Sequence, residues 1–475
     1  MTKKLLILFL FLGNSLIFLL KQPLTGDGLF TASLVRLPFK EMWTYIIGDF
    51  HPPLYYFSLA LFARIFGFND LVLRLFSIIF GLLAIAIFYI FLKETFDESI
   101  AFFSSLVLVF LPNFIFSSRE PRMYPMFLFL VILSFFFFNR LLKEKSILLI
   151  SGFTLSLLLL LYSHNWGLIV FFYLLAFTII SGNFKKFLTP FTLSFIGYLP
   201  WLPIFLNQLT LKTALGRSWG LPVENFWPRL WGAFLWNYNL LELPYIFWLV
   251  ASLSAFFSIL FLLLHCFRKK ELLYLNLLLP SNILLFYLLT FREPFLTFSH
   301  ISYLVPFYAL GLGKGLNSFK NKNLSYAILI TFTGLLFLFN VFHHYLLPIS
   351  GTRTAQLFIK DQNQPGVLVF LTPYEALRMS WYLNSSPHQF ITLSQDELPL
   401  FVMKDKLADQ AVSALNELKE QHHGWVFYTG INIHRKDRAS IYDPQIRIKN
   451  WLEKNSVRKI PFGADTPYPV YLYEF

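Results

Sequence analysis

The chain has 475 residues, of which 56% are hydrophobic, 20% aromatic and only 14% charged. Soluble domains average roughly 25% charged residues, so this composition excludes an ordinary soluble globular protein. The formal net charge of +13 does not indicate nucleic-acid binding, because residues 350–475 are nearly neutral, with 14 Lys and Arg against 13 Asp and Glu. The excess of basic residues lies in short segments between apolar runs.

Those apolar runs are about 17–25 residues long, which is the length that spans a bilayer. They predict a polytopic α-helical membrane protein with about eleven transmembrane helices, at residues 4–20, 70–92, 99–117, 122–142, 146–163, 166–182, 188–206, 244–266, 271–290, 300–317 and 324–346. The first run follows Lys3 and Lys4 but has no small-residue cleavage site, so we interpret it as a retained anchor helix. Basic clusters at alternate helix ends predict a cytoplasmic N-terminus. An odd number of spans then places the C-terminal part outside.

The first predicted outer loop, residues 21–69, contains the most unusual residues of the chain. It holds Asp27, a short helix around residues 29–47 and the motif Gly-Asp-Phe-His-Pro-Pro-Leu-Tyr-Tyr at residues 48–56. The double proline removes two backbone donors and cannot continue a helix. An apolar helix at 54–66 follows and is too short to span, so we expect it to lie along or dip into the membrane interface.

Four further corners fall on the outer side of the predicted topology. Ionisable residues near a membrane are costly and are candidates for function. These corners contribute Arg119, Glu120, Arg122 and Tyr124 from residues 117–125, His164 from residues 162–166, Arg217 from residues 207–243, and His300 from residues 292–300.

The C-terminal part has a different pattern. Short strand-like runs at 367–371, 390–393, 425–428 and 470–473 alternate with helix-like stretches at 354–362, 374–383, 405–421 and 443–454. Alternation of this kind predicts a small α/β domain. We therefore predict a transmembrane domain at residues 1–348 and an extracytoplasmic α/β domain at residues 349–475.

The candidate residues each allow a structural and a functional interpretation. Asp27, between Gly26 and Gly28, is either an accessible catalytic carboxylate or the N-cap of the helix that follows. Arg119 and Arg122 offer the planar donor forks that bind phosphate, or they are cations at a helix end with Glu120 as their partner.

The histidines and Arg217 are equally open. His51 could face a phosphate or transfer a proton, or it could be a hydrogen-bonded loop residue. His164 and Arg217, each near a tryptophan, suit sugar or headgroup contact and also the aromatic belt of a membrane interface. We see no spacing of His, Asp, Glu or Cys typical of a metal site and no serine nucleophile motif.

Taken together, these motifs resemble the GT-C superfamily of polytopic glycosyltransferases. The similarity is to the group that contains protein O-mannosyltransferases, the aminoarabinose transferase of lipid A and RgtA/B/C/D-like bacterial enzymes. It rests on the order and spacing of Asp27, the His-Pro-Pro-Leu-Tyr-Tyr element at 51–56, Arg74, Ser77 and Gly81 after Phe66-Gly67, the Glu-Pro-Arg-Met-Tyr-Pro element at 120–125, Leu-Pro-Trp-Leu-Pro at 199–203 and Tyr-Leu-Val-Pro at 303–306.

The resemblance implies transfer of a sugar from a polyprenyl-phosphate donor to a lipid, glycan or protein acceptor at the outer face of the cytoplasmic membrane. It assigns the catalytic carboxylate to Asp27, and it directs His51, Arg119 and Arg122 toward the donor phosphate, with Tyr55, Tyr124 and His300 beside the substrate. Polyprenyl phosphate is a good leaving group, so no cofactor is required, and the sequence does not specify a divalent metal.

Departures from the family pattern keep other assignments open. Gly28 replaces the Glu of the family's Asp-Glu pair, so Glu120 or Asp49 could supply the second acid. Pro121 replaces Ala, and Ser302 stands where relatives carry Arg, a position that His300 could cover. We expect inversion at the anomeric carbon because no outer pair of carboxylates suits a double displacement. A flippase or transporter of lipid-linked sugars, and an O-antigen ligase or polymerase, are the alternatives.

Overall fold

The structure is a computed structural model, and its helices and strands fall into two compact units. It describes residues 2–17, 19, 24, 26–49, 51–216, 226–235, 245–266, 272–292, 301–346, 355, 357–359, 361, 367–370, 373–383, 389–392, 405–421, 424–429, 439–462 and 470–474. The first unit comprises Met1–Leu19 and Phe50–Tyr345, and the second comprises Leu20–Asp49 and Leu346–Phe475. Residues 20–49, which include more than half of the predicted outer loop, thus group with the C-terminal residues.

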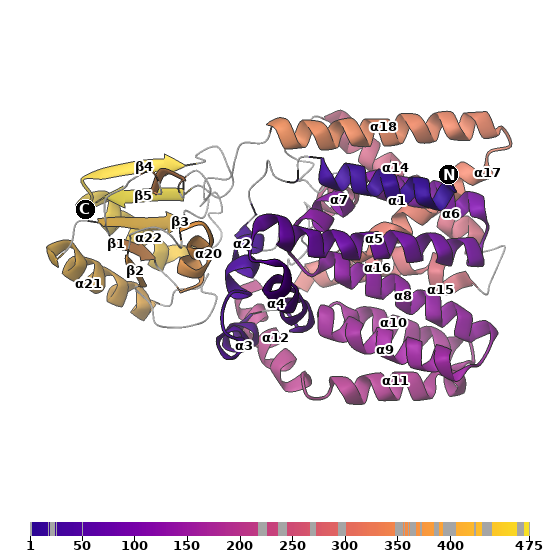
Figure 1. Cartoon of the computed structure of the whole chain (residues 1–475), viewed down its shortest axis with the longest axis horizontal. Helices are drawn as coiled ribbons and strands as arrows, with labels where there is room; N and C mark the ends of the chain where they lie inside the picture. The colour runs from indigo at the N-terminus through magenta and orange to yellow at the C-terminus, as the bar shows by residue number, and fades with distance from the viewer. Residues whose placement is uncertain are drawn as a thin grey trace. The chain divides into compact units, whose positions relative to one another are not determined.

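The first unit is a bundle of helices (Figure 1). Its helices are α1 (Lys3–Leu16), α4 (Leu54–Phe66), α5 (Asp70–Thr95), α6 (Glu98–Phe110), α7 (Pro112–Arg119), α8 (Tyr124–Lys143), α9 (Ile147–Ser163), α10 (Gly167–Ile180), α11 (Phe184–Tyr198), α12 (Leu202–Gly216), α13 (Phe226–Leu235), α14 (Tyr245–Cys266), α15 (Leu273–Asn276), α16 (Leu278–Arg292), η4 (Ser302–Leu304), α17 (Val305–Ser318) and α18 (Lys322–Leu346). The predicted interfacial helix at 54–66 is α4, with the same bounds.

Three helices in the described part of the chain are long and apolar enough to cross a membrane: Asp70–Thr95, Tyr124–Lys143 and Lys322–Val341. Two bent pairs raise the number to five if each pair is one span. The predicted count of about eleven is not confirmed and stays a prediction. Several predicted spans are helices shorter than a bilayer crossing needs, such as α10 with 14 residues.

Prolines explain both bends. The pair α6 and α7 bends by 62° and the pair α11 and α12 by 70°. Pro112 begins α7, and Pro200 lies in the link before α12. A proline has no backbone N–H, and its ring clashes with the preceding turn, so the helix axis changes direction there. Because of the bend at Pro112, the C-terminal end of α7 can contact the ends of other helices.

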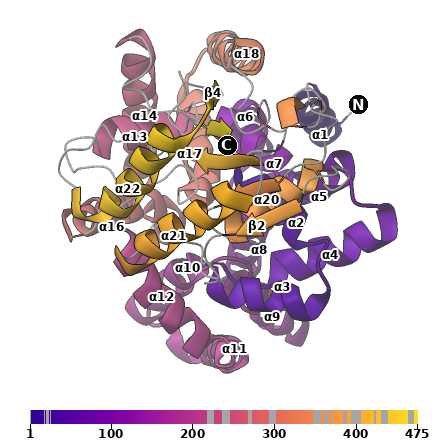
Figure 2. The ribbon, with the colours of Figure 1, turned by 90° about the vertical axis from the view of Figure 1, so that its left-hand side faces the viewer.

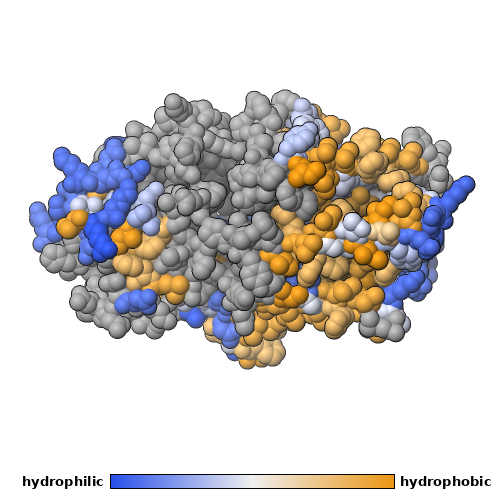
Figure 3. Space-filling model, turned by 90° about the horizontal axis from the view of Figure 1, so that it is seen from above, coloured by the Kyte–Doolittle hydropathy of each residue, from blue (hydrophilic) through white to orange (hydrophobic). Residues whose placement is uncertain are grey.

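Apolar side chains cover much of the exposed surface of the bundle, as the space-filling view shows (Figure 3). Ile65, Leu148 and Ile180 are 74%, 78% and 85% exposed. Large exposed apolar areas mark a surface that faces lipid or a partner. This surface fits the membrane protein that the composition predicts.

Helix α17 packs unusually closely against two neighbours through its glycines. A Cβ atom at Gly311 would overlap Ser258 of α14, and one at Gly313 would overlap Ser104 of α6. A Cβ at Gly315 would overlap Phe261, also of α14. Positions 311 and 315 share a helix face and 313 lies opposite. Small residues of this kind let helix backbones approach closely within membranes.

The second unit contains a mixed sheet with the strand order β2-β1-β3-β5-β4. Strand β1 pairs in parallel with β2 and β3, whereas β5 pairs antiparallel with β3 and β4. Its elements are α2 (Gly26–Leu34), α3 (Phe39–Gly48), β1 (Val367–Phe370), α20 (Pro373–Leu383), β2 (Gln389–Thr392), α21 (Asp405–Gln421), β3 (Gly424–Thr429), α22 (Ala439–Asn455), β4 (Arg458–Phe462) and β5 (Val470–Glu474).

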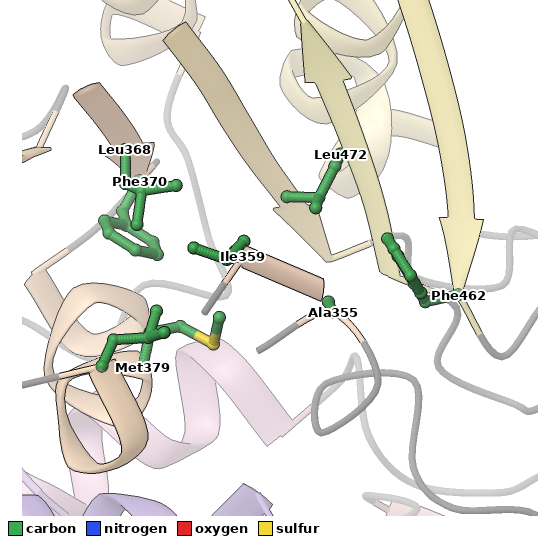
Figure 4. Packing of buried hydrophobic residues seen from close by; sticks show 8 residues of the cluster. Ala355, Ile359, Leu368, Phe370, Met379, Phe462 and Leu472 are labelled. Carbon is green, nitrogen blue, oxygen red and sulfur yellow. The ribbon is translucent and has the colours of Figure 1, made fainter. Parts of the chain in front are cut away.

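Both faces of the sheet are buried. Successive side chains of a strand point to opposite sides of the sheet, so each strand contributes to both cores. Val369 packs with residues of α21 and α22 on one face. Leu368 and Phe370 pack on the other face with Met379 of α20 and with Ile359 (Figure 4). Helices therefore cover the sheet on two sides.

Four of the five strands fall where the sequence predicts strands, and β4 is the one missed. Its residues Arg458, Lys459 and Pro461 give no apolar alternation, and the strand pairs only with β5 at the edge of the sheet. Charged residues and proline are typical of edge strands. The single helix predicted around 29–47 is instead two helices, α2 and α3, separated at Pro38.

Candidate active site

The candidate site lies in the helical unit where α7 ends and α8 begins. Residues 120–123 form the link between the two helices, and Pro125 stands in the first turn of α8. Proline is favoured in the first turn of a helix and disfavours helix in the residue before it. The Glu-Pro-Arg-Met-Tyr-Pro motif is thus a proline-bounded corner, tightened by a hydrogen bond from Arg122 N–H to the Glu120 carbonyl (2.7 Å).

A buried ion pair joins this corner to α5. Arg74 Nη1 lies 3.7 Å from Glu120 Oε1, with side chains 2% and 8% exposed. The same nitrogen donates to the Arg119 carbonyl at 3.2 Å. That carbonyl belongs to the last turn of α7, where carbonyls lack helical partners and favour a cation.

The position of Arg74 follows from the turn before α5. Gly67 adopts a φ of +105°, a backbone conformation that other residues rarely tolerate. The side chain of Asn69 accepts a hydrogen bond from Val72 N–H at 3.0 Å and so caps α5. Arg74 comes one turn later, on the buried face of α5.

Arg119 and Arg122 are also buried, at 4% and 5% exposed. Arg119 donates from Nε to the Ile115 carbonyl and from Nη1 to the Ile17 carbonyl, both at 3.3 Å. Arg122 donates from Nη1 to the Tyr56 hydroxyl at 3.3 Å. Arg119 therefore joins α7 to the end of α1, whereas Arg122 joins the corner to the first turn of α4.

His51 and His164 lie beside each other next to this corner. Their ring centroids are 5.4 Å apart in an edge-to-face arrangement. His164 is buried, stacks on Phe127 at 4.9 Å and lies 6.0 Å from the Tyr124 ring. Its Nδ1 accepts a hydrogen bond from Trp166 N–H at 3.1 Å, so the proton of the neutral ring is on Nε2. The structure thus brings together two histidines that are distant in the sequence.

Tyr55 is a further buried residue of this cluster. Its hydroxyl is within 2.9 Å of Ser77 Oγ, and both side chains are fully buried. Burial raises the pKa of the Tyr55 hydroxyl above its ordinary value, and the Ser77 hydrogen bond offsets only part of that rise. Tyr55 therefore remains protonated at neutral pH.

The remaining predicted residues are Asp27, Arg217 and His300. Asp27 belongs to the second unit, where it is exposed in the first turn of α2, one residue after the helix begins. It is thus not the residue that precedes the helix, as the N-cap interpretation requires. Arg217 and His300 lie outside the described residues.

Arg74 is the residue that sequence reasoning did not name as a site residue. Its signal was present, because a guanidinium inside an otherwise apolar helix is costly unless something specific binds it. Among the described residues no group of three or more His, Cys, Asp or Glu could hold a metal ion.

The burial of the Arg74–Glu120 pair predicts that neutralising Glu120 lowers stability more than neutralising Glu94, a carboxylate in a surface ion pair. Glu120→Gln leaves the Arg74 guanidinium buried without its carboxylate and should lower the stability of the detergent-solubilised protein by about 3–5 kcal/mol. Glu94 forms a shorter ion pair with Arg140, at 2.8 Å, but on the surface. Glu94→Gln should cost less than about 1 kcal/mol. Thermal unfolding of both variants measures the difference, and an equal loss would show that burial does not set the strength of the Arg74–Glu120 pair.

Known proteins match this chain in two ways. One match is to the sequence of the segment that carries the site, and the other is to the fold. Residues 50–205 match the family described as dolichyl-phosphate-mannose-protein mannosyltransferase, a segment that includes every residue of the cluster from His51 to His164. No curated protein matches the chain.

Solved structures match almost the whole chain. ArnT from Cupriavidus metallidurans bound to undecaprenyl phosphate is 13% identical with a TM-score of 0.65, and the match covers 98% of this chain and 97% of that one. In its apo state ArnT gives a TM-score of 0.68 at 11% identity, with the same coverage. The apo Archaeoglobus fulgidus oligosaccharyltransferase is 12% identical with a TM-score of 0.56, and the match covers 90% of this chain and 69% of that one. The chain thus has the fold of the GT-C superfamily of membrane glycosyltransferases, and the resemblance predicted from its sequence motifs is confirmed.

Proposed function

We propose that this protein transfers a sugar from a polyprenyl-phosphate-linked donor to a lipid, glycan or protein acceptor at the outer face of the cytoplasmic membrane. The observation that carries the proposal is the buried cluster of Arg74, Arg119 and Arg122 at the junction of α5, α7 and α8. A cationic cluster at the ends of apolar helices suits one kind of ligand well, an anionic phosphate attached to a membrane lipid.

The names of the matched proteins support this ligand chemistry. The description of the matched family names dolichyl phosphate mannose, and one ArnT structure holds undecaprenyl phosphate. Both compounds contain a polyprenyl phosphate. The donor of this chain is proposed to belong to the same class.

Among the three arginines, we assign Arg122 as the main ligand of the donor phosphate. Arg119 donates to two backbone carbonyls, and Arg74 joins Glu120 to the end of α7. Arg122 instead bonds a tyrosine hydroxyl, which a phosphate oxygen can replace at little cost, since it accepts the same bond more strongly. His51, Tyr124 and His164 complete this side, and Arg217 and His300 stay proposed substrate contacts.

The reaction needs one proton acceptor and one stabilised leaving group. Asp27 takes the proton of the acceptor hydroxyl as its oxygen attacks the anomeric carbon. The bond from that carbon to the phosphate oxygen breaks, and the electron pair leaves with polyprenyl phosphate. Cations at that oxygen stabilise the developing charge. Glu120, paired with Arg74, is assigned to holding the arginines in place rather than to proton transfer.

Asp27→Asn tests the catalytic assignment. It keeps the size and much of the hydrogen bonding of the side chain but removes the base, so the transfer rate should fall by about 10²–10⁴-fold. Asp70, the acid in the first turn of α5, provides the matched control, and Asp70→Asn should keep most of the activity. Transfer of radiolabelled sugar in membranes measures both. Near-full activity of Asp27→Asn would move the base to Asp49 or Glu120.

Substitution of Arg122 tests the phosphate assignment. Arg122→Ala should weaken the affinity for the polyprenyl-phosphate donor by about 1.5–3 kcal/mol, the scale of a hydrogen bond to a charged group. Arg122→Lys should restore only part of the affinity because it lacks the bidentate fork. Arg140→Ala, at an exposed ion pair, is the control. Unchanged donor affinity in Arg122→Ala would place the phosphate elsewhere.

The orientation in the membrane is proposed from the basic loops. We place the N-terminus in the cytoplasm and the second unit outside. Protease added to spheroplasts should then cut within residues 349–475, whereas the link that contains Lys143 and Lys145 should resist. Inverted membrane vesicles should show the opposite pattern. A C-terminal part that is cut only in inverted vesicles would refute this topology.

A further inference from the structure

Helix α2 is buried along nearly its whole length, yet its second residue is an exposed acid. Residues 28–35 are all buried, including the polar side chains of Thr31 and Ser33, whereas Asp27 is exposed. The backbone of Asp27 belongs to the first turn of α2, so the position of its Cα atom is set by the position of the helix. Whatever holds α2 therefore also sets where the Asp27 carboxylate can reach.

Helix α20, which lies between β1 and β2 in the sequence, packs against α2. The two helices lie side by side in the second unit (Figure 2). Met379 and Leu383 of α20 pack onto the sheet. Trp381, two residues after Met379, lies about 200° around the helix from it, on the opposite face. Helix α20 thus lies between the sheet and α2.

A stacked arginine joins the end of α2 to that outer face of α20. The Arg36 guanidinium carbon lies 3.8 Å from the centroid of the Trp381 ring. Arg36 Nη1 also makes a long hydrogen bond, 3.5 Å, to the Trp381 carbonyl. Stacking on tryptophan is the best form of a cation–π contact. The carbonyl belongs to the last turn of α20, where a cation is favoured.

We infer that Arg36 and Trp381 are positioning residues. They fix the helix that carries Asp27 against the C-terminal sheet and so hold the catalytic carboxylate at the position from which it takes the proton. The inference rests on the proposed function of Asp27. A general base must lie within hydrogen-bond reach of the proton that it takes. Residues of the C-terminal part then contribute to catalysis by holding a helix that precedes them by more than 300 residues.

The test compares Arg36→Ala and Trp381→Ala with the conservative variants Arg36→Lys and Trp381→Phe in the full-length protein. Each alanine variant should lower kcat by about 10–100-fold, the cost of misplacing a reacting group by roughly 1 Å, with the KM for the donor unchanged. The conservative variants should recover part of the rate, because Lys keeps the charge without the planar face and Phe keeps an aromatic ring. Arg64→Ala is the control, since Arg64 also bonds a carbonyl and approaches an aromatic ring but lies on α4.

Hydrogen exchange of the α2 amides supplies a readout that does not depend on activity. Both alanine variants should exchange faster at residues 30–34, with α5 unchanged. Unchanged exchange in α2 would overturn the inference, and so would faster exchange with a full kcat. In an Asp27→Asn background, Arg36→Ala should add almost no further loss. An undiminished further loss would show that Arg36 acts through another group.

The two hypotheses fail in different ways. Full activity of Asp27→Asn alone would refute the assignment of the base, and with it the positioning of a catalytic group, whatever α2 exchange shows. Loss of activity in Asp27→Asn with a full rate in Arg36→Ala would refute only the positioning inference.

Discussion

The buried pair of Arg74 and Glu120 is the constraint on which the helical unit's site depends. Taking a guanidinium and a carboxylate out of water costs several kcal/mol for each ion, and only good geometry and further hydrogen bonds recover that cost. Here Arg74 finds both Glu120 and the last-turn carbonyl of Arg119. Three helices, α5, α7 and α8, must therefore meet at one point for either charge to be tolerated. The same meeting point carries Arg122 next to Tyr56 and His51 next to His164.

Prolines interrupt the helices at that point. Pro52 and Pro53 precede α4, Pro112 begins the bent helix α7, and Pro121 and Pro125 bound the corner before α8. Each removes a backbone donor that would otherwise need a partner in an apolar environment. Interrupted helices also present terminal carbonyls and amides, which bind charged groups. The charged residues of the site gather where helices end, because free backbone groups there can bind charge.

Local patterns in the sequence predict the elements well and the long-range contacts poorly. The short helix at 54–66 and four of the strands follow from apolar runs bounded by turn residues. The polar corner at 119–124 follows from a run of ionisable residues between apolar helices. The meeting of His51 with His164, and of Arg74 with Glu120, does not follow, because both depend on how distant helices pack. Strand β4 could not be predicted, since an edge strand with Lys459 and Pro461 carries no alternation. The split of the first outer loop, with Asp27 in the second unit, is equally a tertiary property.

The glycines of α17 have a consequence for how sequences with this fold can vary. Gly311 and Gly315 admit α14 on one face, and Gly313 admits α6 on the other. An added side-chain carbon at Gly311 or Gly313 would meet backbone atoms of the neighbouring helix, whereas at Gly315 it would meet the ring of Phe261. Packing, rather than exclusion from water, drives helix association within membranes. Substitution at Gly311 and Gly313 would therefore separate α17 from α14 and α6. Sequences with this fold should therefore vary in side-chain size at other positions of the bundle rather than at Gly311 and Gly313.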